Sequence, residues 1–222
     1  KDDAKSGAFP VVIPMEYRVD FTDTAYKDMM EHASITVETE LCGVLIGEVF
    51  HDSMGFYLKV NAAIEGKHSN NYGAQVTFTH DTWQYISEVK DSQYPDQRIV
   101  GWYHTHPGFG VFLSGMDNFI QENFFNAPYQ VAVVIETKEH VEGCFAWVDG
   151  KSQPLSRFWI DGREHKLATG AVEKLDMADT GMASSVVHVG GAAPEYGGQP
   201  VFSWFHLVMA GLFLLLGVMC GK

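Results

Sequence analysis

The sequence predicts an α/β fold of the α+β kind, in which a mixed β-sheet is flanked by helices. Strand-like and helix-like stretches alternate over residues 11–161 without an internal repeat or a break in composition. The stretch VAVVI at residues 131–135 is continuously apolar, as a central strand buried on both faces should be. The hydrophobic content of 46% is enough for a sizeable core, and 222 residues fit one domain with some chain left over.

The individual elements follow from capping residues and from the spacing of apolar side chains. Thr22 and Asp23 are typical of a helix start, and Ser114 is an N-cap residue for the segment that follows it. Residues 41–47 (LCGVLIG) are typical of a buried strand closed by glycine. On these grounds we expect helices at residues 24–33, 81–89 and 114–125, and strands at residues 41–47, 56–60, 98–103, 131–135 and 143–148.

The C-terminal part of the chain has a different composition. Residues 162–200 are rich in Gly, Ala, Ser and Thr without a sustained period, so we expect a flexible linker there. Residues 201–220 carry no formal charge. At about 1.5 Å per residue such a helix spans a hydrocarbon core of about 30 Å, so we expect a C-terminal transmembrane helix. The alternative is a buried core helix.

The first residues bear on where the domain is expected to lie. Residues 1–10 form an N-terminal extension without the apolar run of a signal peptide. We therefore expect a membrane-anchored protein whose domain at residues 11–161 faces the cytoplasm.

Charge and cysteine content exclude some classes of function. The formal net charge is −13, so a surface that neutralises phosphates is not expected and neither is a nucleic-acid partner. The three cysteines are far apart and include no CxxC pair, which argues against a disulfide framework and against a cysteine-rich zinc site. Apart from His104 and His106, the histidines are scattered and are expected to be solvated or structural.

The informative stretch is GWYHTHPGFGVFLSGMD at residues 101–117. His104 and His106 are two residues apart at the end of a predicted strand, so both imidazoles lie on the same face and can bind one ion. Asp117 falls in the first turn of the next predicted helix, where the helix dipole favours a carboxylate. Two imidazoles and one carboxylate suit a single Zn²⁺ ion with a fourth position open for water, as in a catalytic site.

The motif His104-x-His106-Pro107 followed by Ser114-x-x-Asp117 resembles the signature of the JAMM (MPN, Mov34) zinc metalloproteases, most closely their deubiquitinating branch in the proteasome lid and the signalosome. The resemblance extends to the strand E-x-x-G-x-L-x-G at residues 40–47 and covers most of residues 11–160. It implies the cytidine-deaminase-like MPN fold. It also implies hydrolysis of the amide bond after the C-terminal Gly-Gly of ubiquitin or a ubiquitin-like protein.

Two residues acquire catalytic roles from this resemblance and from the chemistry of a metal-activated water. Glu40 would act as the general base and then as the acid toward the leaving amine. Ser114 would donate its hydroxyl to the oxyanion. The alternatives are structural: Ser114 and Asp117 have the spacing of a helix-capping arrangement, and Glu40 could be a charge at a strand edge.

Substrate contacts are expected in two segments. Deubiquitinating relatives clamp the modifier tail with a loop or hairpin before the helix that precedes the His-x-His strand. Here that segment is residues 67–78, which ends in Val76, Thr77 and Phe78 and can accept a tail as an added β-strand. Phe109, between two glycines beside the metal, is expected to line a channel that only glycine can pass, although a packing role is equally open.

Three functions are compatible with the motif. The first is a membrane-tethered isopeptidase acting on conjugates of ubiquitin or a ubiquitin-like protein. The second is a hydrolase of the same family that acts on another peptide or carrier-protein bond. The third is a scaffold that is inactive alone and needs an activating partner subunit.

Overall fold

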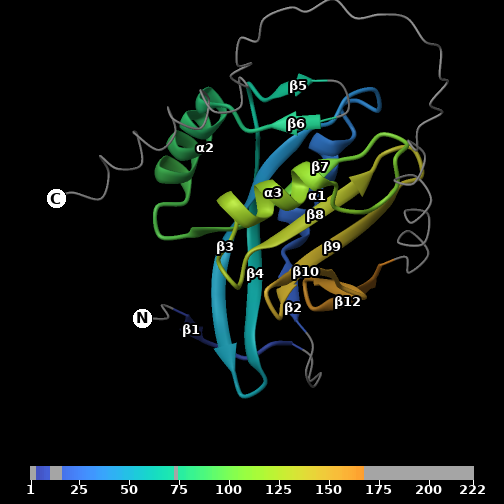
Figure 1. The fold of residues 1–222 in the computed structure, drawn as a ribbon. Coiled ribbons are helices and arrows are strands. Elements are labelled where there is room, and N and C mark those ends of the chain that lie inside the picture. Colours follow the sequence, from blue (N-terminus) through green and yellow to red (C-terminus); the bar gives the residue numbers. More distant parts are fainter. Residues whose placement is uncertain (1–3, 11–16, 73–74, 168–222) are drawn as a thin grey trace, which may run out of the picture. The chain divides into compact units, whose positions relative to one another are not determined.

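The computed structural model describes residues 4–10, 17–72 and 75–167, which fall within one compact unit, Lys1–Gly181 (Figure 1). The helices in these residues are α1 (Asp23–Ala33), α2 (His80–Gln93) and α3 (Gly115–Phe124). The strands are β1 (Lys5–Ser6), β2 (Arg18–Phe21), β3 (Cys42–Asp52), β4 (Gly55–Glu65), β5 (Asn70–Tyr72), β6 (Gln75–Thr77), β7 (Arg98–Thr105), β8 (Val131–Glu136), β9 (Val141–Val148), β10 (Lys151–Pro154), β11 (Arg157–Ile160) and β12 (Arg163–Lys166).

Most of these strands form one mixed sheet in the order β10-β9-β8-β7-β3-β4-β2-β11-β12, with β1 paired to β3. β7 pairs with β8 in parallel, whereas β3 is antiparallel to both β4 and β7. β3 and β4 lie side by side as a long pair (Figure 1). β5 and β6 form a separate two-stranded hairpin. The mixed sheet with helices that the sequence predicts is therefore confirmed.

Helices cover both faces of the sheet because successive side chains of a strand point in opposite directions. Val44 of β3 packs in one cluster with Ile86 of α2 and Ile120 of α3, whereas its neighbour Leu45 packs in another cluster with Met29 of α1. The helix α1 therefore covers one face, and α2 and α3 cover the other.

Each helix begins at a hydroxyl-bearing N-cap residue. The side chains of Thr22, Thr79 and Ser114 accept hydrogen bonds from backbone N–H groups in the first turns of α1, α2 and α3. Such caps satisfy N–H groups that have no partner inside the helix. The three predicted helices are present, although α2 continues four residues past the predicted end at residue 89.

The sequence predicts a strand at residues 41–47 that ends at Gly47, but the strand continues beyond this glycine. β3 continues to Asp52, and its register shifts between Ile46 and Gly47. A Cβ atom at Gly47 would lie 2.0 Å from the carbonyl oxygen of Lys59 in β4. The glycine therefore permits a close approach of two backbones at a bulge and does not end the strand.

The ordered domain extends beyond both predicted boundaries. Before residue 11, β1 pairs with β3 and Phe9 is buried. After residue 161, where a linker is predicted to start, β12 pairs with β11 through a turn in which Gly162 has φ of +73°. The polar sequence of β12 has no apolar alternation, so the pattern gave no sign of a strand.

The predicted membrane span at residues 201–220 lies outside the described residues, as does most of the predicted linker at residues 162–200. Among the residues that the structure describes, no helix is both long enough and apolar enough to cross a membrane.

Candidate metal centre

Three side chains that the sequence singles out converge at one end of β7. His104 lies in β7, His106 follows it directly, and Asp117 lies in the first turn of α3. The Nε2 atoms of the two histidines are 3.0 Å apart. The carboxylate oxygens of Asp117 lie 3.4 Å from Nε2 of His104 and 3.5 Å from Nε2 of His106. All three residues are buried.

These separations fit a tetrahedral zinc ion. Ligand atoms that each lie about 2.0–2.2 Å from Zn²⁺ are about 3.3–3.6 Å from one another when the angles are tetrahedral. The two imidazole nitrogens and the nearest carboxylate oxygens, Oδ1 for His104 and Oδ2 for His106, lie within a few tenths of an ångström of this range. Among the described residues, His104, His106 and Asp117 are the group of three that could hold a metal ion. The donor set also suits zinc, which binds neutral imidazole and carboxylate.

Burial and mutual contact set the charges in this group. Burial lowers the pKa of His104, whose ring has no contact with solvent. Burial also opposes the charged form of His106, but the hydrogen bond and charge of Asp117 raise its pKa above the ordinary value. For Asp117, the two histidines and Ser114 outweigh burial and hold the pKa of the carboxyl well below its usual range. The carboxylate is therefore ionised and ready to bind a cation.

Two hydrogen bonds at the start of α3 fix the position of the Asp117 side chain. The Ser114 side chain accepts a hydrogen bond from the Asp117 N–H at 3.2 Å, and the Asp117 carboxylate accepts one from the Ser114 N–H at 2.7 Å. This is a capping box, so the structural alternative for the pair is also present. The Ser114 hydroxyl still has its own proton to donate, because a hydroxyl both donates and accepts.

Glu40 lies beside the metal-binding group, two residues before β3 begins. Its carboxylate is buried and lies 3.9 Å from Nε2 of His106. The chain around it is fixed to β7, since Leu41 and Thr105 exchange two hydrogen bonds, of 2.8 Å to the Thr105 hydroxyl and 2.9 Å to the Leu41 carbonyl. Sequence reasoning did not identify Thr105, because a threonine in a strand gives no distinguishing signal.

Aromatic rings hold the two histidines. The ring of Trp102 stacks on His104 with 4.5 Å between centroids, and its indole N–H donates to Gln121 of α3. Phe112 packs against His106 with centroids 4.8 Å apart. Nδ1 of His104 is buried without a hydrogen-bond partner in the described residues, so its orientation depends on this stacking. The carbonyl oxygen of Gly110 lies 3.1 Å from Nδ1 of His106.

The residues predicted to bind substrate lie in three different environments: an exposed loop, a separate hairpin and a packed cluster. Phe109 is 55% exposed in the loop after His106. Val76 and Thr77 lie in β6 of the separate hairpin, so the predicted strand is present there. Phe78, in contrast, stacks on Trp83 with centroids 5.0 Å apart and packs with the cluster on the α2 face. The structure thus brings the metal-binding set together with Glu40 and Ser114, and gives Phe78 a packing role.

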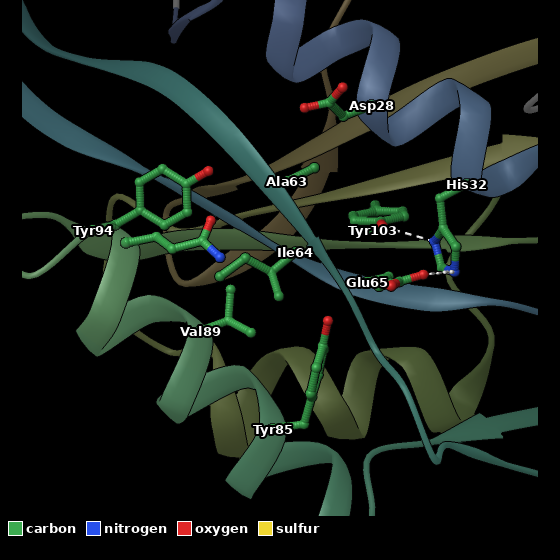
Figure 2. A pocket seen from close by; sticks show the side chains of 10 residues that line it. Asp28, His32, Ala63, Ile64, Glu65, Tyr85, Val89, Tyr94 and Tyr103 are labelled. Carbon is green, nitrogen blue, oxygen red and sulfur yellow. Dashed lines mark hydrogen bonds and ion pairs between the residues drawn. The ribbon is translucent and has the colours of Figure 1, made fainter.

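The pocket in Figure 2 lies away from this centre, between α1, α2 and the end of β4, with a volume of about 260 Å³. Val89 and Ile64 line it together with polar side chains from both helices. At one side, Nδ1 of His32 lies 2.8 Å from the hydroxyl of Tyr103, and burial lowers the pKa of His32. The expected structural role of His32 agrees with this hydrogen bond.

Comparison with known proteins identifies a matching family and several relatives. The family profile described as "JAB1/Mov34/MPN/PAD-1 ubiquitin protease" matches residues 16–127. "Ubiquitin carboxyl-terminal hydrolase RPN11" of Saccharomyces cerevisiae is 32% identical over 117 residues, which cover 52% of this chain and 37% of that protein. "26S proteasome non-ATPase regulatory subunit 14" of Drosophila melanogaster is 31% identical over 137 residues, covering 60% and 42%.

A third relative extends the comparison to a different complex. "COP9 signalosome complex subunit 5" of Kluyveromyces lactis is 29% identical over 119 residues, which cover 52% of this chain and 30% of that protein. The chain therefore spans well under half the length of each of these three relatives.

Proposed function

Because this chain belongs to the JAB1/Mov34/MPN/PAD-1 ubiquitin protease family, we propose that it is a zinc-dependent isopeptidase acting on conjugates of ubiquitin or a ubiquitin-like protein. The proposed reaction is hydrolysis of the amide bond after the C-terminal Gly-Gly of the modifier. The observation that carries the proposal is the buried group of His104, His106 and Asp117 with Glu40 beside it. The names of the relatives, a ubiquitin hydrolase and subunits of the proteasome and the signalosome, support the substrate class.

His104, His106 and Asp117 would hold the metal, and each offers a nitrogen or oxygen atom within 4.8 Å of the other two. When bound there, zinc lowers the pKa of water to roughly 7 and polarises a carbonyl group. Proton transfer and stabilisation of the oxyanion are assigned to side chains of the protein.

Glu40 is the proposed proton carrier. Its carboxylate is near enough to the metal-binding histidines to accept a proton from the attacking water and to return it to the leaving amine. Ser114 is proposed to donate its hydroxyl to the oxygen that gains negative charge, a contact worth about 10²–10³ in rate in other enzymes. Phe109, exposed in the loop beside His106, is proposed to narrow the path of the modifier tail, and Val76 and Thr77 of β6 to pair with that tail.

The test uses Glu40→Gln, which keeps the size of the side chain and removes its ability to carry a proton. We expect turnover of a ubiquitin-like C-terminal fusion to be lost while stoichiometric zinc is retained. The measurement is cleavage of a panel of such fusions together with metal analysis, with Glu48→Gln in β3 as control. Turnover retained by Glu40→Gln would overturn the role of Glu40.

The wild-type result separates the other functions when the panel also includes other peptide and carrier-protein bonds. Zinc-dependent cleavage only of other peptide or carrier-protein bonds would support the hydrolase of a different substrate. Zinc binding without any cleavage would support a protein that needs an activating partner subunit.

A further inference from the structure

Glu136 is a buried carboxylate that the proposed mechanism does not use. It is the last residue of β8, and its side chain has no exposed surface. Its carboxylate accepts backbone hydrogen bonds from Gly108, Lys138 and Glu139. Burial opposes the charge of this carboxyl, but the three N–H donors and Lys138 lower its pKa below the ordinary value. A buried ionised carboxylate that is so fully hydrogen-bonded is a rigid anchor for the backbone that it binds.

The anchored backbone is the loop that follows the His-x-His motif. Gly108 has φ of +80° and Gly110 has φ of +86°, conformations that favour glycine. The loop packs closely on the turn after β8, since a Cβ atom at Gly108 would lie 3.3 Å from Cδ of Lys138. At its start, the His106 N–H donates to the carbonyl of Ile135 at 2.8 Å. Residues 106–110 are therefore bound to the end of β8 at two points.

The far end of this loop contacts a predicted metal ligand. The carbonyl oxygen of Gly110 lies 3.1 Å from Nδ1 of His106. If that nitrogen carries the proton, Nε2 has its lone pair free and directed at His104 and Asp117. The hydrogen bond to Gly110 is the one that fixes which nitrogen of His106 is available for a metal.

We infer that Glu136 is a positioning residue for the metal centre: by holding the Gly108 N–H it fixes the loop whose Gly110 carbonyl orients the His106 ring. The inference rests on the proposed function in one respect, namely that His106 binds zinc. It adds to the centre a residue from a different strand, which acts through the Gly108 backbone.

The test is Glu136→Gln, which keeps the shape of the side chain but replaces one acceptor oxygen by an NH₂ group. That group faces N–H donors and cannot accept from them. We expect zinc affinity, measured by competition with a chromophoric chelator, to fall by about 10- to 100-fold, as for other residues that orient metal ligands. We also expect the Gly108 amide of the metal-free protein to exchange with solvent faster than in the wild type.

Glu142→Gln is the matched control. Glu142 is another buried glutamate, in the neighbouring strand β9, and its carboxylate contacts the Tyr26 hydroxyl at 2.7 Å and Nε2 of His165 at 2.6 Å. These partners belong to α1 and β12, not to the loop after His106. We expect Glu142→Gln to lower thermal stability while leaving zinc affinity and Gly108 exchange unchanged.

Three results decide the matter. Wild-type zinc affinity in Glu136→Gln overturns the inference and leaves the proposed function standing. Equal losses of affinity in Glu136→Gln and Glu142→Gln overturn it as well, because they point to general destabilisation. A wild-type protein that binds no zinc overturns the proposed function itself. Should Glu136→Gln not fold, Gly108→Ala disturbs the same contact from the other partner and is expected to weaken zinc binding too.

Discussion

Asp117 illustrates how one side chain serves both local structure and the candidate site. Its carboxylate closes the capping box with Ser114 and at the same time faces both histidines. The cap holds the carboxylate in one orientation, so a metal ion meets an ordered ligand. Capping and metal binding were alternatives for this pair at the level of sequence, and in the structure the first supports the second.

Replacement of Ser114 separates the cap from the chemistry. In Ser114→Ala the helix loses its N-cap, which costs about 1 kcal/mol of stability. The proposed oxyanion contact is lost too, which lowers the rate by about 10²–10³. Urea unfolding and steady-state kinetics measure the two effects.

Thr79→Ala is the control for this prediction, because Thr79 caps α2 through the same kind of hydrogen bond, with the Thr82 N–H at 3.1 Å. It should lower stability by a similar amount and leave the rate unchanged. A Ser114→Ala variant that loses stability alone would exclude the hydroxyl from catalysis.

At the scale of elements, the pairing of β3 with β7 brings Glu40, the proposed general base, to the candidate metal ligands. Cys42 pairs with His104 in the register of these strands, so Glu40, two residues earlier, reaches the end of β7. A shift by one residue would turn Glu40 and the histidines to opposite faces. The bulges in β3 near Gly47 lie at the other end of this pairing and leave the register at the site intact.

An ion pair fastens the strand β2 to the end of β3. Arg18 is buried, and its guanidinium donates to both carboxylate oxygens of Asp52, at 2.7 and 2.8 Å. The aromatic rings of Phe9 and Tyr57 lie against the guanidinium. The hydrogen bonds from Arg18 hold the pKa of Asp52 well below its usual range.

This depressed pKa makes the contribution of Asp52 depend on pH. The stabilisation is complete above the pKa of an unfolded aspartate, about 3.9, and is lost as the pH falls through the lower folded value. We therefore expect Asp52→Asn to have a lower free energy of unfolding than the wild type at pH 7. The difference between the two proteins should become smaller below about pH 4. Urea unfolding of both proteins between pH 7 and pH 3 tests this, and a gap that stays constant over that range contradicts it.

At the scale of the whole molecule, zinc is expected to stabilise the fold. The candidate metal ligands come from β7, the loop after it and α3, so they are close together only in the folded chain. A ligand that binds the folded state alone stabilises it by about 2.7 kcal/mol at a hundred times its Kd. We expect a chelator to lower the Tm of the wild type in calorimetry. Asp117→Ala should show a lower Tm that the chelator does not change.

The membrane anchor at residues 201–220 is a prediction for the full chain. Full-length protein is expected to float with phosphatidylcholine vesicles in a density gradient, whereas a chain ending at residue 167 should stay in the aqueous fractions. The described residues support that shorter form, because β11 and β12 complete the sheet by Lys166. Full-length protein that stays in the aqueous fractions would contradict the anchor.

Much of the fold could be predicted because its signals are local. Cap residues such as Thr22 and Ser114, and the continuously apolar β8, are visible in a short stretch of sequence. The strands β2, β11 and β12 were missed, since each has four residues and is defined by its partner strand. Short strands depend on pairing between distant parts of the chain, which a local pattern does not contain.

The sequence by itself determined which side chains form the candidate centre. Strand periodicity places His104 and His106 on the same face, and the N-cap residue Ser114 places Asp117 in the first turn of a helix. Only the tertiary structure decided how that centre is supported. Glu136 reaches Gly108 across 28 positions of sequence, and Glu40 reaches His106 through the pairing of β3 with β7. Contacts of this kind depend on which backbone groups the fold brings together. The local sequence around a glutamate does not show which N–H groups it will bind when it is buried.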